Sequence, residues 1–196
     1  MATERSGEYG TYYGSVFTAS ESLTSDEMNT NATYIYHFLS AAGWTDNAIA
    51  GILGNMQAES SLNPGRWQGD AVGVTEAGYG LVQWTPATKY LNWATGDAST
   101  MDNNLSRILY ELENNMQWIK TSKYPISFEQ FSQSKKSPAY LASAFLKNYE
   151  RAGVEVEKTR QANAEKWWTY ITGLSPFREK KKKGYNFILF NRKRKV

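Results

Sequence analysis

Residues 51–85 read GILGNMQAESSLNPGRWQGDAVGVTEAGYGLVQWT, and this stretch decides the expected fold. Apolar residues recur at helical spacing just before and within its first part, at Ile49, Ile52, Leu53 and Met56. They predict a helix from Asp46 to about Ser60, with Thr45 as its cap. The turn residues 63–65 (Asn-Pro-Gly) end that helix. The Gly-rich residues 65–84 contain two β-prone pieces, AVGVT and YGLVQW, and predict a small irregular hairpin.

Further helices are expected on both sides of this stretch. Thr24 and Glu27 fit a capping box that opens an earlier helix. Ser137-Pro138 is a typical start for a late helix, and Gly173 ends the last one. The strongest amphipathic stripe consists of Leu105, Ile108, Leu109, Leu112, Met116 and Ile119. We therefore expect a mainly α, lysozyme-like α+β class: a helical bundle around the helix of Glu59, with a small β-hairpin lining a cleft.

The charge and composition divide the chain into three parts. Residues 1–23 are rich in Gly, Ser, Thr and Tyr without periodicity, which predicts a flexible N-terminal arm. Residues 24–174 form the expected catalytic body. Residues 175–196 are a basic tail, because residues 178–196 carry a net charge of +8 and residues 1–177 a net charge of −5.

Several classes of site are excluded by residue type. The chain has no Cys and a single histidine, His37, so neither a thiolate zinc site nor a multi-His metal centre can form. A Ser-His-Asp triad would need His37, which lies in an apolar helical pattern, and no G-x-S-x-G motif is present. We expect no metal and no cofactor, so catalysis must rest on carboxylates.

No sequence feature predicts membrane insertion or export. The chain has no apolar run of about 18 residues or more, so no transmembrane segment is expected. Residues 1–30 lack the basic start and apolar run of a signal peptide. Aromatic residues make up 14% of the chain, which is enough to leave rings over for stacking on sugars after the core is built.

Glu59 is the candidate general acid. At about 100° per residue it projects on the same side as Ile52 and Met56, at the edge of the apolar stripe. It also lies in the last turn of its helix, where the macrodipole is negative. Both effects disfavour the ionised carboxylate and predict a raised pKa, which an acid that protonates a leaving sugar oxygen requires.

A second carboxylate would support the positive charge that develops at the anomeric carbon, or would activate a water molecule. Asp70 and Glu76 lie in the Gly-rich turn, where a hairpin could bring them across a cleft from Glu59. Ordinary surface acids at these positions are an equally good interpretation. Asp70 is slightly favoured because it follows Gly69.

The residues Gly54 to Ser60, then Asn63-Pro64 and Gly78 to Trp84 resemble the phage tail lysozyme family, including the lysozyme domain of tail-knob proteins of small short-tailed phages. More distantly, Glu-Ser followed by Gly-Leu-x-Gln is similar to goose-type lysozymes and lytic transglycosylases. The resemblance covers residues 28–172, and the motif Tyr149-Glu150-Arg151 also matches; Glu150 beside Arg151 is interpreted as a structural ion pair. The resemblance implies that Glu59 is the catalytic acid. The expected substrate-binding residues are Ser60, Trp67, Tyr79, Gly80, Leu81, Gln83 and Trp84, with core packing an equal alternative for the two tryptophans.

The implied function is a peptidoglycan hydrolase, a muramidase that cleaves between N-acetylmuramic acid and N-acetylglucosamine. Two alternatives stay open: a lytic transglycosylase that uses Glu59 alone, and an inactive wall-binding or tail-structural module. The acidic body argues against nucleic acid as a partner. The basic tail suits anionic wall polymers or another virion protein. Two locations are consistent with the sequence: the virion tail, or the host cytoplasm followed by release to the cell wall.

Overall fold

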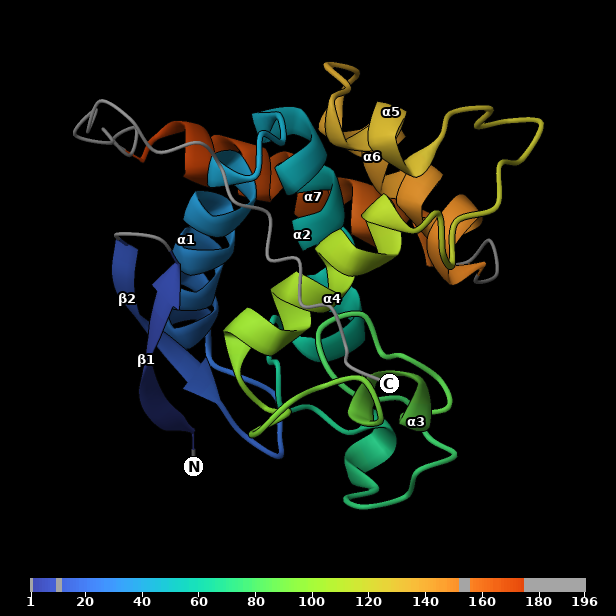
Figure 1. Cartoon of the computed structure of the whole chain (residues 1–196). Helices are drawn as coiled ribbons and strands as arrows, with labels where there is room; N and C mark the ends of the chain where they lie inside the picture. Colours follow the sequence, from blue (N-terminus) through green and yellow to red (C-terminus); the bar gives the residue numbers. More distant parts are fainter. Residues whose placement is uncertain (1, 10–11, 152–155, 175–196) are drawn as a thin grey trace, which may run out of the picture.

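The computed structural model describes residues 2–9, 12–151 and 156–174, and within them the fold is mainly helical, as expected (Figure 1). None of the described helices is long and apolar enough to cross a membrane. The elements in chain order are β1 (Thr3–Tyr9), β2 (Tyr12–Thr18), α1 (Ser25–Ala41), α2 (Asp46–Ser60), the 3-10 turn η1 (Gln68–Asp70), α3 (Thr88–Leu91), α4 (Met101–Glu113), α5 (Phe128–Ser132), α6 (Pro138–Phe145), the π-helical turn η2 (Leu146–Glu150) and α7 (Glu157–Thr172).

Helix α2 packs closely against both α6 and α7, which also contact each other, and two glycines permit this (Figure 1). A Cβ atom on Gly51 would lie 2.8 Å from the Leu141 side chain of α6. A Cβ atom on Gly54 would lie 2.6 Å from the Arg160 carbonyl of α7 and 2.8 Å from the Ala164 amide. Both contacts are closer than a side chain allows, so these positions need glycine for the helices to approach.

The expected helix boundaries near α2 are confirmed, because local capping decides them. Thr24 and Glu27 form a capping box at the start of α1. The Thr45 hydroxyl accepts the Ala48 amide, and α2 runs over the expected residues. Ser137 caps α6 with a proline in its first turn.

The expected flexible arm over residues 1–23 is wrong for residues 3–9 and 12–18, which form two antiparallel strands, β1 and β2, and β2 packs on α1. Val16 of β2 is buried in the core. Gly7 of β1 faces the Tyr34 ring, and an added Cβ would lie 2.6 Å from it. A strand that meets the core through a glycine shows no apolar alternation, so the sequence pattern misses it.

Two other expected elements differ in the structure. Residues 65–84 form no strand pair: they hold only isolated bridges that join Tyr79 to Trp67 and to Trp84. Left-handed backbone at residues 69, 70, 73, 80 and 83 interrupts regular pairing. Helix α4 ends at Glu113, before the expected stripe reaches Met116 and Ile119, because residues 115 and 117 also adopt positive φ.

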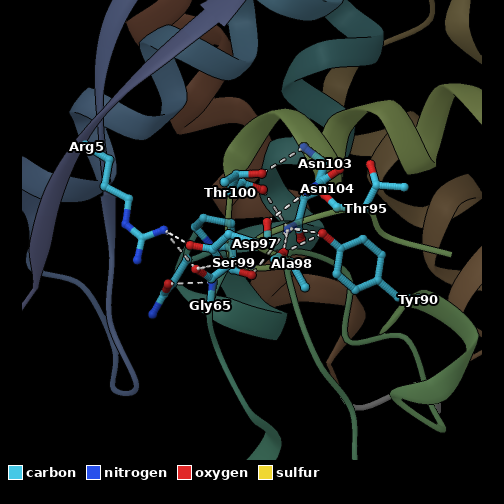
Figure 2. Close-up of polar contacts among 12 residues, drawn as sticks. Arg5, Gly65, Tyr90, Thr95, Asp97, Ala98, Ser99, Thr100, Asn103 and Asn104 are labelled. Atoms are coloured by element: carbon cyan, nitrogen blue, oxygen red, sulfur yellow. Dashed lines mark hydrogen bonds and ion pairs between the residues drawn. The ribbon is translucent and has the colours of Figure 1, made fainter. Parts of the chain in front are cut away.

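Asn104 of α4 holds the loops around the motif segment in place (Figure 2). Its Nδ2 atom donates to the Tyr90 hydroxyl at 2.9 Å and to the Thr100 carbonyl at 3.0 Å. Its Oδ1 atom accepts the Leu81 amide at 3.0 Å. Gly80, at φ +82°, leaves the space that Asn104 occupies. One buried amide therefore fixes the turn on which the Gly-Leu-x-Gln residues lie.

A single buried asparagine on α1 joins the hairpin to the body, so its loss tests this packing. Asn31 accepts the Phe17 amide at 2.7 Å, and donates to the carbonyls of Phe17 and Leu62 at 2.8 and 2.9 Å. We expect Asn31→Ala to lower the free energy of unfolding by about 1–3 kcal/mol for each group left unpaired. Urea unfolding followed by circular dichroism measures the change.

The matched control is Asn29→Ala on the same helix, whose side chain is only partly buried. We expect its free energy of unfolding to change by no more than about 0.5 kcal/mol, which is the range of ordinary surface substitutions. Equal effects of the two substitutions would contradict the proposed role of Asn31.

Candidate active site

The last turns of α2 carry the polar residues of the motif, and each one has a defined partner. Asn55 donates from Nδ2 to the Ala142 carbonyl of α6 at 3.0 Å. Gln57 accepts the Trp167 indole N–H of α7 at 2.9 Å. The Ser60 hydroxyl donates to the Leu81 carbonyl at 3.0 Å. Ser60 therefore ties the end of α2, where Glu59 lies, to the Gly-Leu-x-Gln segment.

The Glu59 carboxylate contacts an arginine that the sequence interpretation did not identify. Arg160 of α7 donates from Nη2 to Glu59 Oε1 at 2.5 Å. The Arg160 side chain is only 5% exposed, whereas that of Glu59 is 22% exposed. Glu59 thus lies at the surface end of a buried charge cluster, and its carboxyl group is accessible to a ligand.

Glu150 is the second carboxylate of this cluster. Its Oε2 atom lies 2.9 Å from Arg160 Nη1, and its side chain is 6% exposed. Burial raises the pKa of Glu150 well above its ordinary value, and the neighbouring negative charge of Glu59 raises it further. The Arg160 guanidinium acts in the opposite direction and does not outweigh them.

The π-helical turn η2 places Glu150 in the cluster. It ends at Glu150, and the next residue, Arg151, has a left-handed φ of +61°. The Arg151 guanidinium points elsewhere and donates to the Gln117 carbonyl at 2.7 Å. The expected ion pair of Glu150 with Arg151 is therefore wrong: Glu150 pairs with Arg160, because the turn separates the side chains of neighbouring residues.

A second buried network joins the aromatic motif segment to η2. Glu111 of α4 accepts the Trp84 indole N–H at 3.1 Å and Arg107 Nε at 2.8 Å, and it also accepts the Tyr149 hydroxyl. Burial and the Glu111 charge raise the pKa of Tyr149 well above its ordinary value, so Tyr149 stays a hydrogen-bond donor. Adjacent residues of η2, Tyr149 and Glu150, thus hold the two networks together.

Most expected substrate-binding residues are buried. Leu81, Trp84 and Ser60 are at most 3% exposed. Gln83 donates from Nε2 to the carbonyls of Gly80 and of residue 66, so its amide N–H groups are occupied by the backbone. These contacts show structural roles for the four side chains, and their contact with substrate stays a prediction.

Trp67 and Tyr79 face a hollow at the surface. It has a volume of about 310 Å³ and lies between the N-terminal hairpin and the motif segment, with Arg5, Ser99 and Gly65 also in its lining. The Trp67 and Tyr79 rings meet edge to face at 4.7 Å. Burial raises the pKa of Tyr79 to about 12, so its hydroxyl stays protonated; Tyr79 is only 5% exposed, and its contact with substrate stays a prediction. Glu59 is not among the residues that line this hollow.

Asp70 and Glu76 both lie on the exposed part of the segment. The Asp70 carboxylate pairs with Arg66, and its side chain is 67% exposed. The structure therefore brings Glu59 together with Glu150, through Arg160, and places Asp70 with Arg66 instead. The role of Asp70 or Glu76 as the second carboxylate stays a prediction.

The site that the sequence missed depends on long-range contacts. Arg160 lies 101 residues after Glu59 in the chain, and the sequence pattern around it is that of an ordinary amphipathic helix. The Tyr-Glu-Arg motif at residues 149–151 was the sequence signal available for Glu150, but it predicted Arg151 as the ion-pair partner, whereas the partner is Arg160. Within the described residues, no group of three or more His, Cys, Asp or Glu side chains is arranged to hold a metal ion.

Comparison with known proteins identifies relatives of the whole body. The sequence model described as phage tail lysozyme matches residues 30–171. Morphogenesis protein 1 of Bacillus phage B103 is 49% identical over 154 residues, which cover 77% of this chain and 42% of that protein. The chain thus spans less than half the length of this relative.

The Glu111 network predicts a large loss of stability when its charge is removed. Glu111→Gln keeps the shape but leaves the buried Arg107 cation, which is 7% exposed, without its counter-charge. Removing one partner of a buried ion pair typically costs about 3–5 kcal/mol, and we expect an effect of that size. Urea unfolding at neutral pH measures it.

Glu113→Gln, on the exposed face at the end of the same helix, is the matched control. Its unfolding free energy should change by no more than about 0.5 kcal/mol. A Glu111→Gln variant as stable as Glu113→Gln would show that the network does not hold Trp84 and Tyr149 as described.

Proposed function

Because this chain belongs to the phage tail lysozyme family, we propose that it cleaves the glycan strands of bacterial peptidoglycan with Glu59 as the general acid. The observation that carries the proposal is the position of Glu59: the motif glutamate lies at the end of α2, partly exposed, on a rigid buried support. The bond cleaved is the one between N-acetylmuramic acid and N-acetylglucosamine, and the activity is that of a muramidase.

The chemistry requires a proton donor at the leaving oxygen of the glycosidic bond. Glu59 is suited to this role because its side chain is partly exposed while α2 packs against both α6 and α7. Such rigid positioning is a large part of general-acid catalysis, since the donor must lie within hydrogen-bond distance of the oxygen. After bond cleavage the same carboxylate takes a proton from the attacking hydroxyl group.

The attacking group distinguishes two outcomes. In hydrolysis, water attacks, and Asp70 or Glu76 assists from the exposed loop. In lytic transglycosylation, the C6 hydroxyl of the muramyl residue attacks and Glu59 acts without a second surface carboxylate. We favour hydrolysis because the family carries the lysozyme description.

The family and the phage relative give the chain a phage lysozyme-like role. The relative is a morphogenesis protein, which supports association with the virion and action on the wall during entry. Release from the host cytoplasm at lysis is the alternative. The expected basic tail, with its anionic wall polymers or virion protein as partners, falls on residues 175–196 and lies outside the described residues.

The central prediction is that Glu59→Gln lowers peptidoglycan turnover by at least about two orders of magnitude, because a general acid commonly contributes that much. Folding should be nearly unchanged, since Glu150 still balances the Arg160 charge in the variant. Clearing of purified cell walls measures turnover, and circular dichroism checks the fold.

Glu129→Gln on the exposed surface of α5 is the control and should retain full activity. If Glu59→Gln kept about a tenth of the wild-type activity, Glu59 would not be the general acid.

The choice between hydrolysis and transglycosylation is tested with Asp70→Asn and Glu76→Gln, assayed separately. We expect the variant that removes the second carboxylate to lose about tenfold or more in activity, and the wild type to release reducing-end muramic acid. Mass spectrometry of the digest identifies the product. Two fully active variants together with a 1,6-anhydro product would establish a transglycosylase instead.

A further inference from the structure

We propose that Glu150 is the proton store of this site: at rest it holds the proton that Glu59 delivers to the leaving oxygen, and it recovers that proton at the end of each turnover. The inference rests on the proposed function of Glu59 and adds a residue that acts through it. Glu150 is in this sense a positioning residue, because it does not itself reach the substrate.

The first argument is a balance of charge. Arg160 contributes one positive charge, and two carboxyl groups contact its two terminal nitrogen atoms, at 2.5 Å for Glu59 and 2.9 Å for Glu150. Two ionised carboxylates on one buried cation would leave one negative charge without a counter-charge, and the 6% exposed Glu150 side chain has little water to stabilise it. Such a charge is removed most easily by binding a proton, so the pair keeps one proton at neutral pH.

The second argument places that proton at rest. The Glu150 side chain is 6% exposed and that of Glu59 is 22% exposed, so water stabilises an ionised Glu59 better than an ionised Glu150. Neither Glu150 carboxyl oxygen has a hydrogen-bond partner among the described residues, and its ionic contact is with Arg160 Nη1 at 2.9 Å. Protonated Glu150 can donate its O–H to Glu59, and this arrangement is the one that its raised pKa reflects.

The third argument concerns the requirement of the reaction. A general acid must carry a proton when the substrate is bound, but a carboxylate that accepts a charge-assisted hydrogen bond from arginine is favoured in its ionised form. Glu150 resolves this conflict because it contacts the same guanidinium as Glu59 and is more deeply buried. Glu59 then presents a proton to the glycosidic oxygen as Glu150 gives one up to it.

The proton balance closes over one turnover. Glu59, which is ionised at rest, receives the single proton from Glu150 and passes it to the leaving sugar oxygen as the glycosidic bond breaks. The attacking water then loses a proton to Glu59 as its oxygen bonds to the anomeric carbon. Transfer of that proton from Glu59 back to Glu150 restores the resting state, with no other reactant.

In the part of the chain that the structure describes, the other charged groups of the surrounding elements do not shift the pKa of Glu150. Helix α6 carries no charged residue, and Glu59 is the only acid in the second half of α2. On α7, Glu157 pairs with Lys123 at 3.6 Å, and its remaining nearby charge is Lys147 of η2. Within the described residues, Glu59 and Arg160 are the charges that act on Glu150.

The test is the pH profile of kcat/KM for Glu150→Gln on purified peptidoglycan. The amide can still donate an N–H to Glu59 but has no proton to transfer. We expect a loss of at least about tenfold at neutral pH, with activity approaching that of the wild type in acid, where solvent protonates Glu59 directly. The alkaline limb of the profile therefore moves to lower pH.

A structural role alone would lower activity by the same factor at every pH, and that result would overturn the proposal, as would a wild-type profile. Glu150→Asp keeps a buried carboxyl group and should restore the alkaline limb toward that of the wild type. Glu157→Gln on α7 is the matched control and should keep the wild-type profile.

The wild-type profile tests the proposal even if Glu150→Gln does not fold. Its alkaline limb should lie well above the ordinary glutamate pKa of 4.5, and a limb at that value would overturn the stored proton. Failure of the proposed function is distinguishable: it would appear as an active Glu59→Gln variant. An inactive Glu59→Gln variant beside a Glu150→Gln variant with the wild-type profile would reject the proton store alone.

Discussion

The Arg160 guanidinium, buried between two glutamates, is the interaction on which the site depends. Because Arg160 is almost fully buried, its charge must be balanced by groups that the fold supplies, and these come from α2 and η2. Arg160 Nη1 also donates to the Asn55 carbonyl at 3.2 Å. Gly54 makes this possible by letting the α7 backbone approach α2. Gly54 and Asn55 of the motif therefore help to place Arg160, and Arg160 in turn positions the Glu59 carboxylate.

A second buried ion pair, between Arg107 and Glu111, connects the aromatic segment to the same region. Glu111 binds Trp84 on one side and Tyr149 on the other, and Tyr149 precedes Glu150 in η2. The Gly-Leu-x-Gln segment is thus linked to helix α2 through Ser60, and to η2, which carries Glu150, through this network. The buried motif residues hold the shape of the site, and Trp67 and Tyr79, whose contact with a sugar stays a prediction, line a hollow at the surface.

The helices and caps that depend on neighbouring residues were predictable from the sequence, whereas the contacts between residues far apart in the chain were not. Helix α2 and the caps Thr24, Thr45 and Ser137 follow from local spacing and hydrogen bonding, and the structure confirms them. The N-terminal hairpin escaped detection because Gly7, rather than an apolar side chain, faces the core. Arg160 escaped because a partner about a hundred residues away leaves no local pattern.

The candidate site shows the same division. The position of Glu59 at the end of a helix was predictable from periodicity, and its role follows from family resemblance. Its charge environment was not predictable, because the burial of Glu150 depends on the π-helical turn η2, which carries no sequence signature. The second surface carboxylate, Asp70 or Glu76, stays a prediction, since both lie on an exposed loop where the fold does not fix their relation to Glu59.

The central claim is that two carboxyl groups and one guanidinium share a proton, and carbon-13 NMR of the glutamate side-chain carboxyl carbons tests it most directly. In uniformly labelled protein titrated from acid to neutral pH, one carboxyl signal should remain in its protonated position at neutral pH. That signal should be absent from Glu150→Gln and present in Glu157→Gln. Titration of every glutamate within the ordinary range, with no protonated carboxyl left at neutral pH, would contradict the account.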